Sequence, residues 1–189
     1  MYAFYFVAKH PFLVIFTQRL IYFAPIPLYH QSKKYFSIIK SHKIMSKVSI
    51  YLNFQGKTEE AFNFYKSVFH TEFAAPIMYN KDIPAHPGMP PLSENELGMV
   101  MHVALPILGG VQIMGTDMLE SMGHKVKIGN NTTINLEPDT RAETERFFNA
   151  LSEGGSDIAP LEDQFWGALW GACLDKYGIR WMFNHTPQQ

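Results

Sequence analysis

The chain has 189 residues, of which 47% are apolar and 17% are charged, and its formal net charge is −1. This length fits one ordinary domain with an extension and excludes a large multidomain enzyme. The apolar content is sufficient for a hydrophobic core, and the low net charge excludes a disordered polyelectrolyte. We therefore expect a globular protein.

The charges are distributed unevenly along the chain. Residues 1–44 contain six basic and no acidic side chains, whereas residues 45–189 contain ten basic and 17 acidic ones. The apolar runs of the first segment are too short to span a bilayer, and it lacks the charged start and cleavage site of a secretory signal. An organellar transit peptide and a membrane-surface anchor are the alternatives. We predict that residues 1–44 are an N-terminal extension outside the fold and that residues 45–189 are the functional domain.

The first half of this domain predicts the order β-α-β-β-β. An alternating, β-branched pattern predicts the first strand, and an apolar stripe predicts the helix, with Thr58 as its N-cap. Four prolines in residues 80–96 predict a long irregular loop. The last two strands form a hairpin. The predicted bounds are a strand at 47–54, a helix at 58–69, and strands at 72–79, 97–105 and 111–114.

The second half predicts the same order again. Thr140 and Glu143 have the spacing of a capping box at a helix start, and Gly154 ends that helix. The Asp175-Lys176-Tyr177-Gly178 segment predicts a turn before the last strand. The predicted bounds are a strand at 132–137, a helix at 140–151, and strands at 156–161, 166–174 and 179–184.

An internal repeat of this kind predicts an α+β fold made of paired βαβββ units. Two half-sheets that lie side by side would form a curved mixed sheet around a cleft, with the helices outside, and such a cleft suits a small molecule. The acidic excess of residues 45–189 argues against nucleic acid, since phosphate binding needs clustered Lys and Arg. No membrane partner is expected for this part of the chain.

Several segments together resemble one known family. They are residues 50–54, 60–65, 102–105 and 114–117, and above all the C-terminal stretch 165–184 with its Phe-Trp-Gly and Asp-Lys-Tyr-Gly sequences. These resemble the PhnB-like branch of the vicinal oxygen chelate superfamily, also called the glyoxalase/bleomycin resistance/dioxygenase superfamily. The resemblance covers residues 47–185. It implies a homodimer of the glyoxalase-like fold, in a superfamily that includes metal-dependent enzymes and proteins that sequester a drug.

Superfamily members that use a metal hold it with His or Glu on the first and fourth strands of each repeat. Here the first strand has no His, Asp, Glu or Cys, and the fourth offers only Gln112. The corresponding strands of the second repeat offer hydroxyl and amide groups, Arg180, Met182 and a terminal Glu137. We therefore predict no cofactor and no metal site of the usual type. A divalent metal in an atypical site is the alternative.

Five residues are candidates for ligand binding. His102 lies in a strand, where it is either a core histidine or part of the cleft wall. Arg180 would suit a carboxylate or phosphonate ligand, and its alternative is a structural ion pair. The full set is His102, Gln112, Trp166, Arg180 and Met182.

Two classes of function follow. We predict a PhnB-like protein that binds a small molecule, and an anion is one candidate for this ligand. The alternative is a metal-dependent lyase, isomerase or dioxygenase with an atypical site. The sequence therefore leaves open whether the protein is an enzyme. Sequences of this kind have also been labelled ubiquinone-pathway methyltransferases, but no glycine-rich loop of the nucleotide-binding type joins a strand to a helix. The single Cys173 precludes an intrachain disulfide and suits the cytoplasm.

Overall fold

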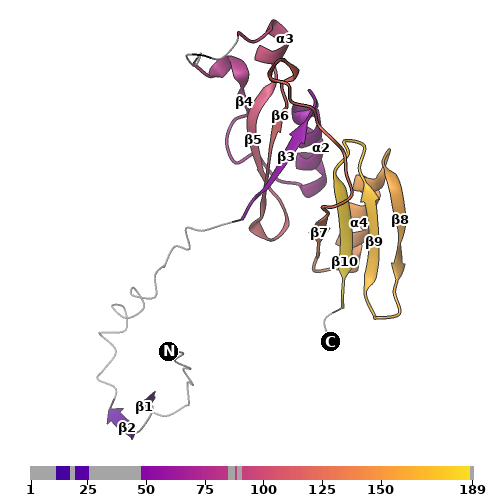
Figure 1. Cartoon of the computed structure of the whole chain (residues 1–189). Coiled ribbons are helices and arrows are strands. Elements are labelled where there is room, and N and C mark those ends of the chain that lie inside the picture. The colour runs from indigo at the N-terminus through magenta and orange to yellow at the C-terminus, as the bar shows by residue number, and fades with distance from the viewer. Residues whose placement is uncertain (1–11, 18–19, 26–47, 85–87, 89–90, 188–189) are drawn as a thin grey trace. The chain divides into compact units, whose positions relative to one another are not determined.

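The computed structural model describes residues 12–17, 20–25, 48–84, 88 and 91–187. The chain divides into two compact units, residues 1–47 and 48–189. Within the first unit, strands β1 (Phe12–Thr17) and β2 (Leu20–Pro25) form an antiparallel pair. The rest of the fold lies in the second unit (Figure 1).

The second unit contains two βαβββ repeats, as predicted. The first repeat consists of β3 (Ile50–Phe54), α2 (Thr58–Phe69), β4 (Met78–Tyr79), β5 (Val100–Pro106) and β6 (Gln112–Asp117). The second repeat consists of β7 (Ile134–Leu136), α4 (Arg141–Ser152), β8 (Ser156–Asp163), β9 (Leu169–Leu174) and β10 (Arg180–His185). Short helices η1 (Asn80–Asp82), α3 (Glu94–Leu97), η2 (Leu108–Gly110) and η3 (Glu120–Met122) lie in the connections.

The two repeats have the same sheet topology. Their strand orders are β3-β6-β5-β4 and β7-β10-β9-β8, so that in each repeat the first strand pairs with the last. That pairing is parallel, and the other pairings are antiparallel, which makes each sheet mixed. The α+β class and the paired βαβββ repeats are confirmed. Within one chain the repeats form two separate open four-stranded sheets.

Register pairs the first strand with the last strand in each repeat. Ile50 lies opposite Ile113 in the first sheet, and Ile134 lies opposite Trp181 in the second.

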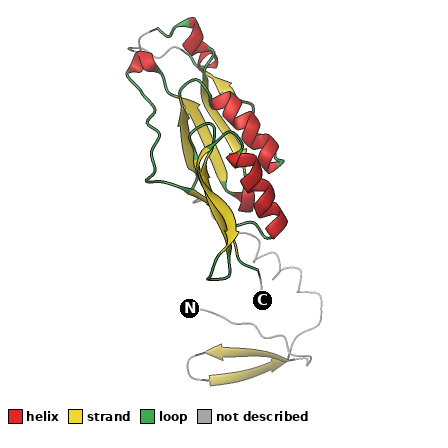
Figure 2. Ribbon diagram, turned by 90° about the vertical axis from the view of Figure 1, so that its right-hand side faces the viewer, coloured by secondary structure: helices red, strands yellow, loops and turns green. Residues whose placement is uncertain are grey.

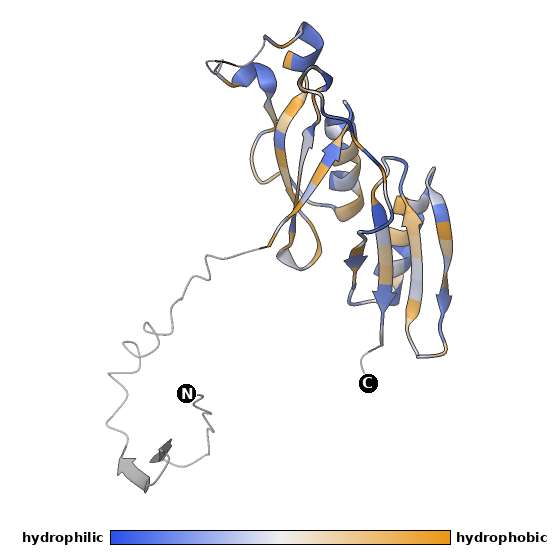
Figure 3. Cartoon of the chain, viewed as in Figure 1, coloured by the Kyte–Doolittle hydropathy of each residue, from blue (hydrophilic) through white to orange (hydrophobic). Residues whose placement is uncertain are grey.

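Helices α2 and α4 cover the same side of the two sheets, as Figure 2 shows. Alternate residues of the strands face the helices and are buried, while neither α2 nor α4 covers the other face of each sheet. Figure 3 shows hydrophobic residues along β5 and β9, whereas η1 and α3 are largely hydrophilic. We call the uncovered sides the open faces of the first and second sheets.

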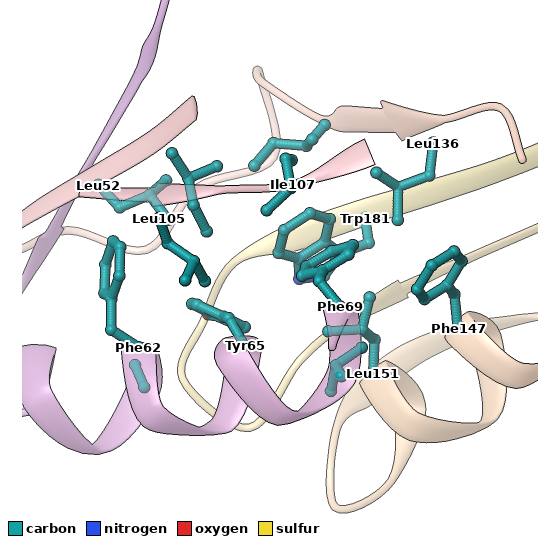
Figure 4. Close-up of a cluster of buried hydrophobic side chains, with 14 of the residues drawn as sticks. Leu52, Phe62, Tyr65, Phe69, Leu105, Ile107, Leu136, Phe147, Leu151 and Trp181 are labelled. Carbon is teal, nitrogen blue, oxygen red and sulfur yellow. The ribbon is translucent and has the colours of Figure 1, made fainter. Parts of the chain in front are cut away.

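One hydrophobic core joins the two repeats (Figure 4). Phe69 of α2 lies 5.2 Å from Phe147 of α4 and 5.9 Å from Trp181 of β10, measured between ring centroids. All three side chains are buried. Each repeat therefore completes the core of the other, and neither sheet buries its helix-facing side alone.

A buried carboxylate reinforces this junction. Asp175, in the turn between β9 and β10, accepts hydrogen bonds from the Tyr65 hydroxyl (2.7 Å) and the Trp181 indole N–H (2.8 Å). Its other oxygen accepts the backbone N–H groups of Tyr177 and Ile179, both at 2.9 Å. Tyr65 belongs to α2 of the first repeat, and Asp175 belongs to the β9–β10 turn of the second. Their hydrogen bond therefore connects the two repeats.

Several predicted element ends differ from the structure. Residues 94–97 form helix α3 and β5 begins at Val100, because Ser93 caps the helix and Glu96 completes a capping box. The second strand is confined to Met78–Tyr79. Strand β6 continues to Asp117, three residues beyond the prediction.

The predicted N-cap of α2 is wrong, and that of α4 is confirmed. Thr58 is the first helical residue, and its backbone N–H and hydroxyl both donate to Oδ1 of Asp117, at 3.0 and 2.7 Å. The acceptor at this helix start is thus supplied by β6 instead of the helix's own side chain. At α4, Thr140 Oγ1 accepts the backbone N–H of Glu143.

Candidate functional site

The open face of the first sheet carries a hydrogen-bonded aromatic pair. The hydroxyl of Tyr51 on β3 lies 3.2 Å from Nδ1 of His102 on β5, and their ring centroids are 5.9 Å apart. The two side chains reach across the intervening strand β6. Partial burial raises the pKa of the Tyr51 hydroxyl above its usual value, so this group is a neutral hydrogen-bonding partner at physiological pH.

From the sequence, His102 is either a core histidine or part of the cleft wall. The imidazole is intermediate in exposure and lies on the open face instead of in the helix-facing core. Gln112 begins β6 on the same sheet, opposite Pro106 of β5. Two of the five candidates therefore belong to the first sheet.

Arg180 and Met182 lie on the open face of the second sheet. Their neighbours Trp181 and Phe183 are fully buried against the helices, so the predicted alternation along β10 is confirmed. Nη2 of Arg180 forms a 2.7 Å ion pair with Asp157. Its Nε is buried and has no hydrogen-bond acceptor among the described residues. The structural ion pair that was the alternative for Arg180 is present.

Trp166 lies away from both pairs of candidates. It occupies the turn between β8 and β9, where it is 53% exposed, and its ring stacks edge-on against that of Phe165. A backbone hydrogen bond from Gly167 to Gln164 closes the turn. The structure therefore distributes the five candidates over two sheets and one hairpin tip.

The residues at the expected metal positions do not fit a metal site. The outward-facing side chains of the first and last strands in both repeats include one carboxylate and no imidazole. The carboxylate is that of Glu137, the residue after β7. These outward-facing residues are Tyr51, Asn53, Gln112, Met114, Thr116, Asn135, Glu137, Arg180, Met182 and Asn184. No group of three or more His, Cys, Asp or Glu side chains able to hold an ion occurs in the described part of the chain. Divalent ions held in proteins need several such ligands.

Cys173 belongs to the core. Its side chain is fully buried on β9, and burial raises the pKa of its thiol to about 12. Because the thiolate is the nucleophilic form, this thiol is unsuited to covalent catalysis.

The described residues form several cavities, and three of them are considered below. One, of about 610 Å³, lies between the start of α2 and the β9–β10 turn. The second, of about 660 Å³, lies at the end of the first sheet near α3 and η3. The third, of about 430 Å³, lies between β3 and β7. None of the three is lined by any of the five predicted binding residues.

The rim of the first of these cavities holds a small polar cluster. Glu60 receives hydrogen bonds from Lys57 (2.7 Å) and from the Tyr177 hydroxyl (3.2 Å). Burial, together with this acid, raises the pKa of Tyr177 to about 12. Both donors bond to Glu60, so the cluster connects α2 to the β9–β10 turn.

Three carboxylates with structural roles were not identified as such from the sequence. Asp117 bonds to Thr58 from 59 residues away, and Asp175 bonds to Tyr65 from 110 residues away, so no local pattern reveals either contact. Glu96 did carry a local signal, because Ser93 and Glu96 have capping-box spacing.

Comparison with known proteins identifies the family. A family model described as 3-demethylubiquinone-9 3-methyltransferase matches residues 46–183. The crystal structure of protein PA1353 from Pseudomonas aeruginosa is 30% identical in sequence, with a TM-score of 0.65 over 76% of this chain and 99% of that one. A PhnB protein from Bacillus cereus, described under the same methyltransferase name, is 26% identical, with a TM-score of 0.59 over 75% of this chain and 100% of that one.

A more distant structure shows the fold alone. The glyoxylase/bleomycin resistance protein/dioxygenase domain from Frankia sp. EAN1pec is 10% identical, with a TM-score of 0.51 over 75% of this chain and 98% of that one. The two open βαβββ sheets thus have the fold of the glyoxalase/bleomycin resistance/dioxygenase proteins. The family model and the two structures above show that the chain belongs to the PhnB-like family, the family described as 3-demethylubiquinone-9 3-methyltransferase.

Proposed function

We propose that this protein binds a small molecule on the open faces of its sheets, without a metal site of the usual type. One observation carries the proposal: the outward-facing positions of the first and last strands hold amides, hydroxyls and methionines where metal ligands would be needed. Such neutral groups orient a ligand by hydrogen bonds and contact. The Tyr51–His102 pair supplies polar groups of this kind.

An anionic ligand is supported by Arg180. Its guanidinium is 18% exposed and is paired with Asp157, which is 63% exposed. Because Asp157 is mostly exposed to solvent, water already competes for this carboxylate, and a ligand carboxylate or phosphonate can replace it at small cost. The buried Nε, which has no acceptor among the described residues, favours a second bond to such a ligand after a small rotation of the side chain.

Methyl transfer, which the family's description names, is not what we propose for this chain. A methyl donor of the nucleotide type needs a glycine-rich loop between a strand and a helix. The β3–α2 connection here is Gln55-Gly56-Lys57, with one glycine.

The experiment combines metal analysis with a ligand screen on the purified full-length protein. We expect no stoichiometric Zn, Mn, Ni or Fe, and we expect at least one small acid to raise the melting temperature. Arg180→Gln should abolish that shift. Arg141→Gln is the matched control, because Arg141 is also ion-paired, to Asp163 and Glu145, but lies on α4.

A tightly held ion in one-to-one ratio would overturn the metal-free proposal in favour of the enzyme alternative. If small acids stabilise the Arg180→Gln and wild-type proteins equally, the assignment of the anion site to Arg180 is wrong. The acids would then bind at another place on the protein.

We also propose a homodimer in the cytoplasm. Among the described residues, β3 pairs only with β6 and β7 only with β10, so these two edge strands can pair with a second copy. No helix in the described ranges is long and apolar enough to cross a membrane. Light scattering coupled to gel filtration tests this, and a monomer mass at micromolar concentration would contradict it.

A further inference from the structure

The cavity at the end of the first sheet is the most apolar of the three. Its volume is about 660 Å³, within the range of small-molecule sites. Helices η1 and α3, the chain after η1 and the segment after β6 contribute to its walls. The apolar side chains that line it include Leu92, Leu97, Met101, Met118, Leu119 and Met122. Methionine side chains adapt to ligands of different shape.

Most polar groups of the lining are already bonded within the protein. Asn80 Nδ2 donates to the Glu96 carbonyl at 2.9 Å, and Thr116 Oγ1 donates to the Val100 carbonyl at 3.2 Å. The carboxylate of Asp117 accepts bonds from the start of α2 and from β5. These groups therefore have little left to offer a ligand.

His124 is the exception. It lines the cavity, its backbone N–H donates to the Leu119 carbonyl, and its imidazole makes no hydrogen bond to another described residue. Among the described lining residues there is no Lys or Arg. An anionic ligand would therefore lose its hydration without gaining a partner of opposite sign. The Asp117 carboxylate, which could attract a cation, already accepts three hydrogen bonds within the protein, whereas one hydroxyl or carbonyl of a ligand could bond to the imidazole.

Glu96 holds the cavity walls together. Its carboxylate accepts hydrogen bonds from Ser93 before α3 (3.1 and 2.9 Å) and from the backbone N–H of Ser121 in η3 (3.2 Å). The two segments are thus connected, although they are far apart in the sequence. This connection preforms the cavity, which lowers the cost of ordering the walls when a ligand binds.

We propose that this cavity is a second binding site, which takes an uncharged, mainly apolar molecule with one hydrogen-bonding group directed at His124. The site goes beyond the proposed function, although its lining shares Thr116 with the open face of the first sheet. It contains none of the five residues predicted to bind a ligand, and it selects for absence of charge, whereas the Arg180 site selects for an anion.

The experiment is a fluorescence titration of the full-length protein with N-phenyl-1-naphthylamine, an uncharged apolar probe. We expect saturable binding to the wild type. Leu97→Glu should weaken binding at least tenfold, because it adds a charge to the cavity rim. Leu97 is 37% exposed, so the protein should fold normally, as far-UV circular dichroism would show.

Val111→Glu is the matched control. Val111 is 40% exposed and precedes β6 at the other end of the same sheet, so its replacement should leave the affinity unchanged. His124 is tested by displacing the probe with 1-naphthol and with naphthalene. The wild type should prefer 1-naphthol about tenfold, which is the value of one good hydrogen bond, and His124→Ala should remove the preference.

Absence of saturable probe binding would overturn the proposal, as would equal loss of binding in the Leu97 and Val111 variants. A preference for 1-naphthol that persists in His124→Ala would overturn the assigned hydrogen bond. Stabilisation by small acids should be the same in Leu97→Glu as in the wild type, so this site and the Arg180 site can fail independently.

Discussion

Asp175 is the residue on which the junction between the repeats depends most. It is 3% exposed and accepts four hydrogen bonds, from two side chains and two backbone N–H groups. No Lys or Arg forms a salt bridge with it among the described residues. The buried carboxylate is therefore compensated by neutral donors, and each donor in turn depends on it.

We predict that Asp175→Ala destabilises the protein by about 3 kcal/mol or more. The substitution leaves the Tyr65 hydroxyl and the Trp181 N–H buried without acceptors, and each such group costs about 1–3 kcal/mol. Urea unfolding followed by tryptophan fluorescence measures the loss. Asp157→Ala, which removes an exposed acid from the same sheet, should cost less than 1 kcal/mol. Equal losses in the two variants would contradict the role given to Asp175.

At the scale of single helices and strands, the packing of α2 on the first sheet depends on one glycine. A Cβ on Gly115 of β6 would lie 2.8 Å from Cζ of Phe62 and 3.2 Å from Cγ2 of Thr58. In the second repeat, Phe183 of β10 packs against Phe148 of α4, and their ring centroids are 5.4 Å apart.

Gly115→Ala should therefore destabilise the protein by about 1–3 kcal/mol through overpacking. Phe62→Leu makes room, so the double variant should be more stable than the sum of the two single losses predicts. Chemical unfolding of all four proteins gives the coupling energy. Additive losses would show that the methyl group is accommodated without moving Phe62.

The connection between α3 and η3 depends on pH through Glu96. Hydrogen bonds from Ser121 and Ser93 lower the pKa of this carboxyl to about 2, below its usual value near 4.5. A lowered pKa in the folded state means that the contribution to stability is complete above the unfolded pKa and is lost as pH falls through the folded one.

We predict that the Ser121 amide stays protected from hydrogen exchange at pH 5–7 and loses part of its protection between about pH 4 and pH 2. Glu96→Gln should show the weaker protection at every pH, because a neutral amide oxygen is a poorer acceptor than a carboxylate. Exchange measured by NMR at single residues tests both expectations. A wild-type profile that matches Glu96→Gln at pH 6 would disprove them.

At the scale of the whole molecule, the sequence predicted the repeated part of the fold well, for a physical reason. The alternation of Arg180 to Phe183 and the stripe of α2 are local patterns, and local patterns determine which face of a strand or helix is buried. The turn at Asp175 was predicted for the same reason. Contacts between distant residues were not predicted, such as the cap that Asp117 provides for α2.

The candidate site was harder to predict than the fold. Periodicity placed Arg180 and Met182 on one face, but it contained no information on Asp157, whose backbone adopts a φ of 48° to reach the guanidinium side of the sheet. The apolar cavity near His124 combines residues from four separate connections and strands, and no spacing in the sequence reports their proximity. Sites made by tertiary packing leave no local signature.

The division between an N-terminal extension and a repeat-built domain gives the last prediction. The hydrophobic core and the buried carboxylates Glu96, Asp117 and Asp175 lie in the unit of residues 48–189, and the family model begins at residue 46. A chain that starts at Met45 therefore keeps every interaction described for this unit. We expect it to unfold cooperatively with a melting temperature within about 2 °C of the full-length protein, a difference well below 1 kcal/mol. Differential scanning calorimetry of both chains decides this, and a markedly lower transition in the shorter chain would show that residues 1–44 contribute to the stability of the domain.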